Sequence, residues 1–423
     1  MQSVLVIGAG LAGLAAARRL ANAGLHVTIV EARNRIGGRV QTVRDRRFSV
    51  PIELGAEFVH GKPQEIWDII QHENLLAASI EGDNWCSENH ELKKCNDFWT
   101  RWLKVAQQLK RAKSYPDRSF SEFIATINLD SETKKCAIEF VEGFNAAHSD
   151  LVSVQYLANA QEATDRVSGD TQFRVFAGLE HIVENFSRFD STDVDVHLNT
   201  PIYEIEWRPG YVRAGGFEAE KAVVTLPLGV LQSGSVMFRP PVKKTEAAAR
   251  SLIMGQVVKI ILNFRSTFWE ERGMKNVSFI HARGERFPTW WTTRPIAAPT
   301  LVGWAGGRPA EELALRGEDF ILSAAIESLA NTFKLDRRAV ERRLCAYYIA
   351  DWQADPFSAG AYSYVPTGSI TAPIVLAEPV ANTLFFAGEA TVTDGNTGTM
   401  NGAIASGYRA ADEVLNERRR QAA

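Results

Sequence analysis

The sequence predicts an α/β protein that begins with a Rossmann-like domain, because its first residues read as strand, glycine-rich turn, helix and strand. The apolar run Val4–Ile7 has the length and character of a buried parallel strand. The letters GAGLAG follow over residues 8–13, and the alanine-rich stretch after them predicts a helix. A second strand is expected over His26–Val30, and it ends on the acidic residue Glu31. This order is typical of one half of a doubly wound sheet that binds a dinucleotide.

The glycines of this turn have separate expected roles. Gly8 permits the tight turn, Gly10 lets the backbone approach a pyrophosphate, and Gly13 lets the helix pack against the strand. The helix N-terminus points N–H groups and a positive dipole end at the phosphates. Glu31 can accept hydrogen bonds from ribose hydroxyls and would repel a 2′-phosphate, so NADP is disfavoured. An ordinary glycine turn is the alternative, and the flanking strands together with Glu31 argue against it.

Length and composition limit the classes of protein and partner. The chain has 423 residues, which fits two domains better than a single core. Its hydrophobic share of 45% is that of a globular protein, and its net charge of −3 argues against nucleic acid or an anionic membrane surface as a partner. No apolar run is long enough for a bilayer span, and the N-terminus lacks the pattern of a secretory signal. We therefore expect a cytoplasmic protein.

The cysteines predict neither a metal site nor a disulfide scaffold. Cys86, Cys95, Cys136 and Cys345 lack metal-ligand spacing, and four in a chain of this length is a low density. Cys86 and Cys95 are close enough in sequence to pair. Because a reducing compartment is expected, we predict that all four are free thiols.

The segment after Glu31 favours FAD over NAD. It carries Arg33 and then Gly37, Gly38 and Arg39, which would place flexible backbone and a guanidinium on the same dinucleotide. This E-x-R-x-R-x-G-G-R pattern resembles the extended FAD fingerprint of the flavin amine oxidase superfamily. That superfamily includes monoamine oxidases, polyamine oxidases, L-amino-acid oxidases and lysine-specific histone demethylases. The motifs of this chain are most similar to those of the polyamine oxidases and the demethylases.

The resemblance recurs in order along most of the chain. The matching segments are Glu53–Gly61, Thr225–Leu231, Phe238–Pro241, Gly255–Phe264, Asp355–Ser369 and Leu384–Leu415. Residues 63–170 match little, although Asp97–Ala112 and Asp130–Phe144 are predicted helices. The resemblance implies an FAD-binding domain built from residues 1–62, 172–238 and 356–423. Residues 63–171 and 239–355 would form a discontinuous substrate domain of mixed sheet plus helices.

The resemblance also implies which residues hold FAD. In the middle segment, Val196 matches a valine whose backbone contacts adenine, and Glu389 matches a glutamate near the ribityl or ribose region. A helix over Asn401–Arg420 would direct its N-terminus at the flavin pyrimidine ring, where its dipole stabilises negative charge. The full set of implied FAD contacts is Gly8, Gly10, Leu11, Ala12, Gly13, Glu31, Ala32, Arg33, Gly37, Gly38, Arg39, Gly55, Ala56, Glu57, Val196, Trp352, Gly388, Glu389, Thr399, Met400 and Ala403.

Lys259 lies in the apolar run Val257–Leu262 and has two interpretations. An edge strand often carries a lysine that blocks pairing with another chain, and the residues alone favour this structural role. The resemblance matches Lys259 instead with the lysine that holds a water at flavin N5, the hydride acceptor. We favour that second role, in which Lys259 assists proton movement or the reduction of dioxygen.

Two further positions, Tyr362 and Thr399, match the walls of the family's amine site. Tyr362 corresponds to an aromatic wall beside the flavin, although a tyrosine packed in a strand is the common alternative. The preceding residue is Ala361 where monoamine oxidases carry the cysteine that links the flavin, so FAD is expected to be non-covalent. Thr399 stands where monoamine oxidases have a second tyrosine. The double aromatic cage is therefore absent, which favours a longer or bulkier amine.

His60 completes the predicted catalytic set, and two roles stay open for it: a structural role, or a place near the substrate nitrogen. In animal spermine and acetylpolyamine oxidases a histidine occupies the matching position. We therefore predict that the chain is an FAD-dependent oxidase of a polyamine-like amine, with dioxygen as the second substrate. An L-amino-acid oxidase would need an arginine for the carboxylate, with Arg174 or Arg294 as candidates. Two alternatives remain. The chain could be a flavin-dependent desaturase or porphyrinogen oxidase, or it could be a flavoprotein without enzymatic activity.

Overall fold

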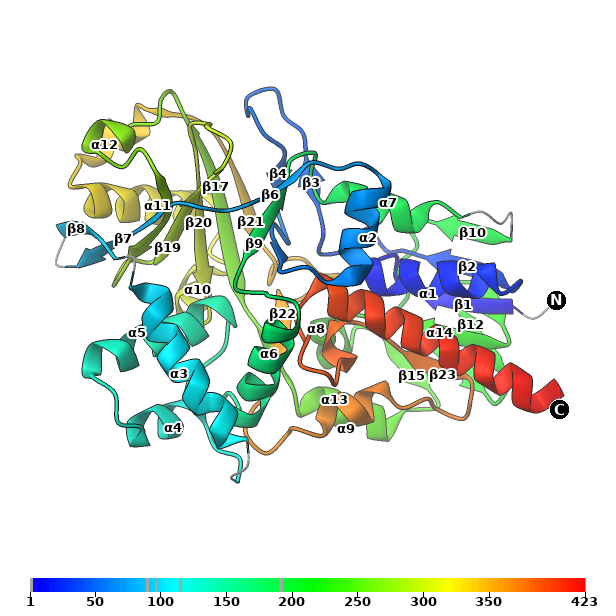
Figure 1. The fold of residues 1–423 in the computed structure, drawn as a ribbon. Coiled ribbons are helices and arrows are strands. Elements are labelled where there is room, and N and C mark those ends of the chain that lie inside the picture. The colour runs from blue at the N-terminus through cyan, green and yellow to red at the C-terminus, as the bar shows by residue number, and fades with distance from the viewer. Residues whose placement is uncertain (1–2, 89–90, 96, 114–115, 190–192, 423) are drawn as a thin grey trace.

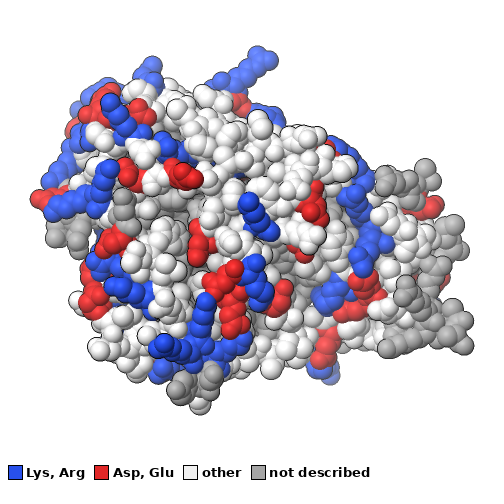
Figure 2. Space-filling model, viewed as in Figure 1, with Lys and Arg blue, Asp and Glu red and all other residues white. Residues whose placement is uncertain are grey.

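The computed structural model describes residues 3–88, 91–95, 97–113, 116–189 and 193–422 (Figure 1). Both ends of the chain lie at one end of the molecule, where the N-terminal strands and the long C-terminal helix meet. The other end holds the largest sheet and a group of helices. On the face in Figure 2, basic and acidic side chains are interspersed, in agreement with the nearly balanced charge of the chain.

A parallel sheet joins three distant parts of the sequence. Among the described residues its strands run in the order β10-β2-β1-β14-β23. They are β1 (Ser3–Ile7), β2 (His26–Val30), β10 (Val194–His197), β14 (Lys221–Val224) and β23 (Leu384–Phe386). Each pairing is parallel, and the strands come from the segments predicted for the FAD-binding domain. The boundaries of that domain stay a prediction.

Both faces of this parallel sheet are covered, as its nearly continuous apolar strands require. On one face α1 (Leu11–Asn22), α7 (Glu180–Ser187) and α14 (Met400–Ala422) pack over Val4, Val27 and Phe385. On the other face lies the sheet β13-β12-β11-β15. Its strands are β11 (Glu204–Arg208), β12 (Tyr211–Ala214), β13 (Phe217–Ala219) and β15 (Met237–Arg239).

The largest sheet has the order β21-β17-β20-β19-β18-β7-β8 in the described part of the chain. Its strands are β7 (Asp83–Glu88), β8 (Glu91–Lys94), β17 (Val257–Phe264), β18 (Val277–Ala282), β19 (Thr289–Thr292), β20 (Thr300–Gly306) and β21 (Leu344–Asp351). Strand β17 pairs with β20 on one side and β21 on the other, and all eight of its residues are buried. The edge-strand interpretation of Lys259 is therefore wrong, because β17 is an interior strand.

Helices surround this large sheet. Helix α11 (Glu318–Phe333) with α10 (Arg308–Leu313) and α12 (Arg337–Glu341) covers one face around Ile260 and Trp290. A separate group packs around its own core and contains α3 (Phe98–Ala112), α4 (Phe120–Thr126), α5 (Ser131–Phe144) and α6 (Val154–Arg166). The predicted helices over 97–112 and 130–144 correspond to α3 and α5. Each begins one residue later than predicted, and Asp130 caps α5 by accepting the Thr133 N–H at 2.8 Å.

Short elements connect these parts. They are α2 (Gln64–His72), α8 (Leu228–Ser233), α9 (Lys243–Arg250), α13 (Ala372–Ala377), the 3₁₀ turns η1 (Glu270–Arg272) and η2 (Glu389–Thr391), and strands β3 (Thr42–Val43), β4 (Ile52–Glu53), β5 (Val59–His60), β6 (Ala77–Ser79), β9 (Gln172–Val175), β16 (Ile253–Gly255) and β22 (Tyr362–Tyr364). Strand β22 pairs with β16, and β9 lies between β5 and β6.

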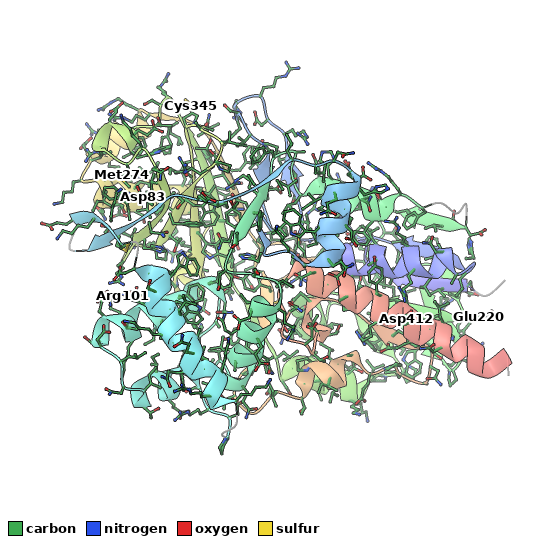
Figure 3. All side chains as sticks on the ribbon, in the orientation of Figure 1. Asp83, Arg101, Glu220, Met274, Cys345 and Asp412 are labelled. Atoms are coloured by element: carbon green, nitrogen blue, oxygen red, sulfur yellow. A yellow bond between two sulfur atoms is a disulfide. The ribbon has the colours of Figure 1, made fainter. Side chains whose placement is uncertain are left out.

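The prediction of four free thiols is wrong for one pair. Cys86 and Cys95 form a disulfide with a Cα–Cα distance of 5.7 Å. The hairpin of β7 and β8 folds the chain back on itself, and the Cys95 N–H then bonds the Asn84 carbonyl at 2.9 Å. Cys136 is a buried thiol and Cys345 an exposed one near the outer end of the large sheet (Figure 3). In the part of the chain that is described, no helix is long and apolar enough to cross a bilayer.

Candidate cofactor and active site

One large cavity, of about 980 Å³, connects the two principal sheets. It begins at the carboxyl ends of β1, β2, β14 and β23, where Gly8, Glu31, Thr225 and Gly388 line it. In open α/β sheets this edge is where ligands bind. The cavity then passes Lys259 on β17 and continues between the large sheet and α5. Its elongated form spans the site predicted for a dinucleotide and the site predicted for chemistry.

The glycine turn has the geometry that its sequence predicts. Gly8 has φ of 105°, and a Cβ there would lie 2.5 Å from Thr225 Oγ1. A Cβ at Gly13 would lie 2.0 Å from the Gly8 carbonyl oxygen, so a side chain would force α1 away from the sheet. No atom lies within 4 Å of a Cβ built on Gly10, which leaves that backbone open to the cavity. The three glycines therefore provide the turn, the helix packing and the close approach separately.

Glu31 is buried at the end of β2 with only 4% of its surface exposed. Its Oε2 accepts the Ala9 N–H at 2.8 Å, and its Oε1 accepts the Arg33 N–H at 2.9 Å. The Arg33 guanidinium is held by Asp355 at 2.7 Å, which ties this loop to the C-terminal segment. The carboxylate thus shapes the turn and also lines the cavity, as an acceptor for sugar hydroxyls must.

Arg39 and Glu389 form an ion pair further along the cavity, with 2.9 Å between Nη1 and Oε1. Arg39 also donates to the Ala361 carbonyl at 2.7 Å. Glu389 accepts the Ser363 hydroxyl at 2.7 Å. This pair connects the first segment of the chain to the last two motifs of the sequence, so the cavity wall depends on parts that are distant in the chain.

Helix α14 begins at the cavity. Thr399 caps it, because its hydroxyl accepts the Gly402 N–H at 3.0 Å and donates to the Asn396 carbonyl at 2.6 Å. Met400 and Ala403 in the first turn line the cavity. The N-terminus of a long helix therefore faces the space, and its dipole favours negative charge there.

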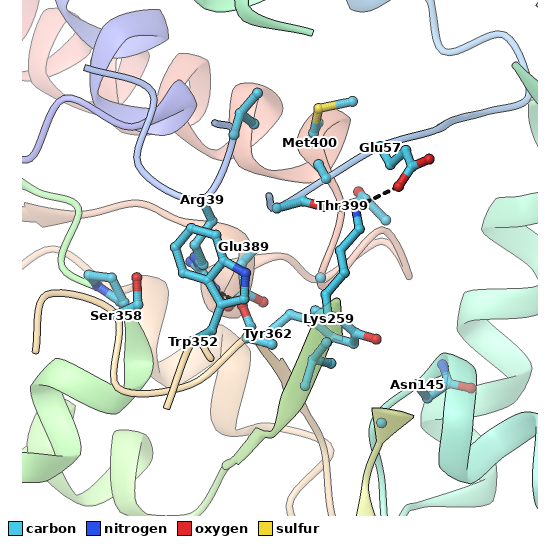
Figure 4. Close-up of a pocket in the computed structure, with 18 of the residues that line it drawn as sticks. Arg39, Glu57, Asn145, Lys259, Trp352, Ser358, Tyr362, Glu389, Thr399 and Met400 are labelled. Carbon is cyan, nitrogen blue, oxygen red and sulfur yellow. Dashed lines mark hydrogen bonds and ion pairs between the residues drawn. The ribbon is translucent and has the colours of Figure 1, made fainter. Parts of the chain in front are cut away.

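Lys259 reaches from the middle of β17 across the sheet to the loop after β4 (Figure 4). Only 1% of it is exposed. Its ammonium donates to the carbonyls of Glu53 at 2.6 Å and Gly55 at 3.3 Å, and it lies 2.5 Å from Glu57 Oε2. The structure therefore brings Lys259 to the cavity, but it also gives this side chain three acceptors that the sequence did not predict.

The carboxylates of Glu57 and Glu53 lie in contrasting environments. Burial opposes the ionisation of Glu57, but the charges of Lys259 and Arg174 outweigh it and lower its pKa to about 2. Burial raises the pKa of Glu53 to about 7, although the Leu179 N–H and the Thr42 hydroxyl bond its carboxylate. Glu57 is thus ionised through the physiological range while Glu53 titrates within it.

Tyr362 lies on β22 with its ring against the start of α14. A Cβ built on Gly398 would be 3.4 Å from Tyr362 Cδ2, which puts the ring beside the turn that carries Thr399. The hydroxyl donates to the Phe144 carbonyl at 2.6 Å, and burial raises the pKa of this phenol well above its ordinary value. Tyr362 is consequently a neutral, fixed wall of the cavity.

His60 ends β5 between two aromatic rings. Its ring centroid is 5.5 Å from that of Phe144 and 6.5 Å from that of Phe58, both edge to face. Burial lowers the pKa of His60 to about 4, although a bond with the Gly169 backbone opposes the shift. The imidazole is therefore uncharged at neutral pH, and an amine next to it meets no positive charge from this residue.

The sequence did not identify most of the substrate half of the cavity. Aromatic residues are the largest group among its additional lining residues, and acidic and basic residues accompany them: Phe98, Trp99, Glu139, Phe140, Glu142, Phe144, Asn145, Tyr156, Phe279, His281, Arg283, Glu285, Arg286, Trp291, Trp304, Arg308 and Glu312. Phe140 and Phe144 stack at 5.1 Å, four residues apart on one face of α5. That helical spacing was a usable signal within a predicted helix. Nothing local indicated that this face would meet β17 and β18.

Nearly all the predicted cofactor and catalytic residues line the cavity, and the exceptions are Gly13 and Val196. Gly13 lies behind the turn, as its packing role requires. Val196 is 41% exposed on the edge strand β10, and Ile202, six residues later, lines the cavity instead. In the described part of the chain, Arg174 and Arg294 are not among the residues that line the cavity.

Fold and site together define a dinucleotide-binding flavoprotein: a parallel sheet with a glycine turn, an acidic residue at the end of β2 and a long cavity that extends to a second domain. The residues fit FAD, since the open Gly10 backbone, the Glu31 carboxylate and the α14 N-terminus lie along a single cavity. The sequence pattern of the flavin containing amine oxidoreductases matches residues 11–98 and 106–415. The chain belongs to this family and is an FAD-dependent amine oxidoreductase.

Curated relatives agree with this assignment, and solved structures share the fold. Polyamine oxidase 5 of Oryza sativa subsp. japonica is 29% identical over 97% of this chain and 87% of its own length. Lysine-specific histone demethylase 2 of Homo sapiens is also 29% identical, over 98% of this chain but 53% of its own length. Putrescine oxidase bound to putrescine superposes with a TM-score of 0.81 at 20% identity, covering 98% of this chain and 99% of its own. Cyclohexylamine oxidase from Brevibacterium oxydans gives 0.80 at 21%, with 99% of each chain covered.

Proposed function

We propose that the protein oxidises a polyamine-like amine to an imine and passes the electrons to dioxygen. The net reaction converts an amine with a hydrogen on its α-carbon, plus O₂, into the imine and hydrogen peroxide; water then hydrolyses the imine. FAD supplies the acceptor for the hydride that leaves the α-carbon. The observation that carries this proposal is the continuous cavity that joins the Glu31 turn to Lys259 and Tyr362.

The side chains around the reacting position favour a neutral amine. Tyr362, Trp291 and Trp304 provide aromatic surface that excludes water and lowers the local dielectric. His60 adds no charge, because its pKa of about 4 keeps the imidazole neutral. The α14 N-terminus, together with Lys259 to the extent that Glu57 leaves its charge unbalanced, would supply positive potential that favours negative charge on a bound flavin. An amine that has lost its proton can therefore donate a hydride towards an electron-poor face.

Three observations support a polyamine-like substrate. Thr399 stands where a bulky aromatic residue would narrow the cavity, and its hydroxyl instead caps α14. Glu142 lines the substrate half, where its Oε1 accepts the Ser149 hydroxyl at 2.6 Å, and it offers a carboxylate for a distal ammonium group. The similarity to a polyamine oxidase at 29% identity points to the same class.

An amino-acid substrate needs a cavity arginine that is available to its carboxylate, and the three arginines that line the substrate half of the cavity are each ion-paired: Arg283 with Glu132 and Glu139, Arg286 with Glu327, and Arg308 with Asp150. Arg174 donates hydrogen bonds to the Glu57 carboxylate at 2.8 Å and to the carbonyls of Arg294 and Thr292 at 3.2 and 3.4 Å. Arg294 donates to the Glu81 carbonyl at 2.9 Å. Neither arginine that the sequence offered for a substrate carboxylate faces the cavity.

Anaerobic reduction of the flavin by a panel of amines tests the substrate class. Spermine, spermidine or their acetyl derivatives should reduce it faster than benzylamine or any common L-amino acid. Glu142→Gln should raise KM for these polyamines and leave KM for benzylamine unchanged, because benzylamine has no distal charge. Preferential reduction by L-amino acids would overturn the proposal.

The cytoplasmic location stays a prediction. The Cys86–Cys95 disulfide weighs against it, because disulfides persist mainly in oxidising compartments. Cell fractionation, with thiol alkylation before lysis, would decide between the two.

A further inference from the structure

The Glu57 carboxylate is the centre of a buried charge network in the cavity wall. Its Oε1 accepts the Arg174 Nη1–H and the Trp291 Nε1–H, both at 2.8 Å. Its Oε2 lies 2.5 Å from Lys259 Nζ. These partners come from β9, β19 and β17, so three strands of two sheets converge on one carboxylate.

The Lys259 ammonium group contacts both this network and the backbone of residues 53–55. A lysine ammonium has three hydrogens to donate. The Glu53 carbonyl, the Gly55 carbonyl and the Glu57 carboxylate are three acceptors within reach of Nζ, at 2.6, 3.3 and 2.5 Å. The Trp291 ring adds a cation–π contact at 5.7 Å from its centroid. The ammonium group is therefore fixed in place, and its charge is balanced by a carboxylate at contact distance.

We propose that Glu57 is a positioning residue that holds Lys259 as a charge-compensated ammonium ion and thereby sets how strongly the site stabilises negative charge on the flavin. The inference rests on the proposed function, which puts Lys259 beside the reactive face of FAD. Without Glu57, two cations would be left uncompensated: Lys259, which lines the cavity, and Arg174, which is not among the lining residues. With Glu57 present, one of these charges is cancelled locally.

Other groups face this network but do not replace Glu57. The Glu53 side chain, from the adjacent strand β4, has a pKa raised to about 7 by burial. At pH 6 it is therefore mostly protonated and contributes little charge. The pKa of Glu57 is lowered to about 2 by Lys259 and Arg174 against the effect of burial, so at pH 6 it carries its full negative charge. This difference makes Glu53, four residues before Glu57, a matched control.

Sulfite affinity tests the proposal without substrate turnover, because sulfite is an anion that adds to oxidised flavin at N5. At pH 6, Glu57→Gln in the FAD-loaded protein should lower the sulfite Kd by at least about tenfold, since the Lys259 charge is no longer balanced. Lys259→Met should raise the Kd by a similar factor. Glu57→Asp, which keeps the charge, should stay within about threefold of wild type. Glu53→Gln should also stay within about threefold.

The outcomes separate the proposal from its rivals. A sulfite Kd for Glu57→Gln within about twofold of wild type, with FAD fully bound, would reduce Glu57 to a structural ion pair. Loss of FAD in both Glu57→Gln and Glu57→Asp, with FAD retained in Lys259→Met, would identify Glu57 as a cofactor-loop residue and overturn the proposal. If no amine reduces the flavin, the proposed function fails, while the sulfite series still reports on Glu57.

Discussion

Replacement of Glu31 by alanine tests how this chain holds the adenosine half of FAD. In the structure the carboxylate accepts two buried N–H groups, from Ala9 and Arg33, at 2.8 and 2.9 Å. A hydrogen bond to a charged group contributes about 1.5–3 kcal/mol, so Glu31→Ala removes roughly 3–6 kcal/mol from the turn that forms the site. The ribose hydroxyls also lose an acceptor. That second loss alone corresponds to roughly a ten- to hundredfold rise in the Kd for FAD.

The assay is flavin occupancy after desalting, followed by titration of apoprotein with FAD and by thermal unfolding. Glu31→Gln is the matched control, since the amide keeps one acceptor oxygen in the same place but turns its NH₂ group towards a backbone donor. It should bind FAD more tightly than Glu31→Ala and more weakly than wild type. Full occupancy of Glu31→Ala with a Kd within about twofold of wild type would refute this placement of the adenosine.

Three further predictions follow from the site. Because Ala361 stands where a flavin-linking cysteine would be, acid or heat should release FAD into the supernatant; flavin that stays with the precipitated chain would contradict this. Lys259→Met should retain FAD but slow flavin reduction or reoxidation by about a hundredfold or more in stopped-flow measurements, and wild-type rates in both would return Lys259 to a structural role. Burial lowers the pKa of His60 to about 4, and burial with the Arg283 charge lowers that of His281 to about 4. The unfolded chain therefore binds these protons first, and their contribution to the free energy of unfolding should fall as pH drops from about 6.5 to about 4, by up to roughly 3 kcal/mol per histidine. Burial raises the pKa of Glu53 to about 7, which acts in the opposite direction over this range, so the measurement is made in Glu53→Gln. Urea midpoints of Glu53→Gln that are equal at pH 7 and pH 4.5 would contradict the buried, neutral state of both rings.

The sequence predicted those parts of the site whose chemistry is local. The roles of Gly8, Gly10 and Gly13 follow from spacing within one strand–turn–helix unit, and the structure gives each glycine the geometry that its role requires. Thr399 likewise lies at the start of a helix whose apolar spacing was visible in the sequence.

The rest could not be predicted, because it depends on contacts between distant segments. Lys259 in an apolar strand is compatible with an edge or an interior position, and only the pairing with β20 and β21 distinguishes them. The Glu57–Arg174 contact joins residues 117 positions apart, and no pattern in either segment indicates it. The Cys86–Cys95 bond was missed for a different reason: an expected reducing compartment outweighed a short sequence separation of 9.

Anaerobic mixing of the FAD-loaded protein with spermidine isolates electron transfer from an amine to the bound flavin, which is the step that the proposed function requires. We expect that one equivalent of spermidine removes the visible absorbance of oxidised flavin, and that the absorbance returns in air with about one hydrogen peroxide formed per flavin. Absorbance that is unchanged by spermidine and by every other amine in the panel, with FAD fully bound, would contradict it.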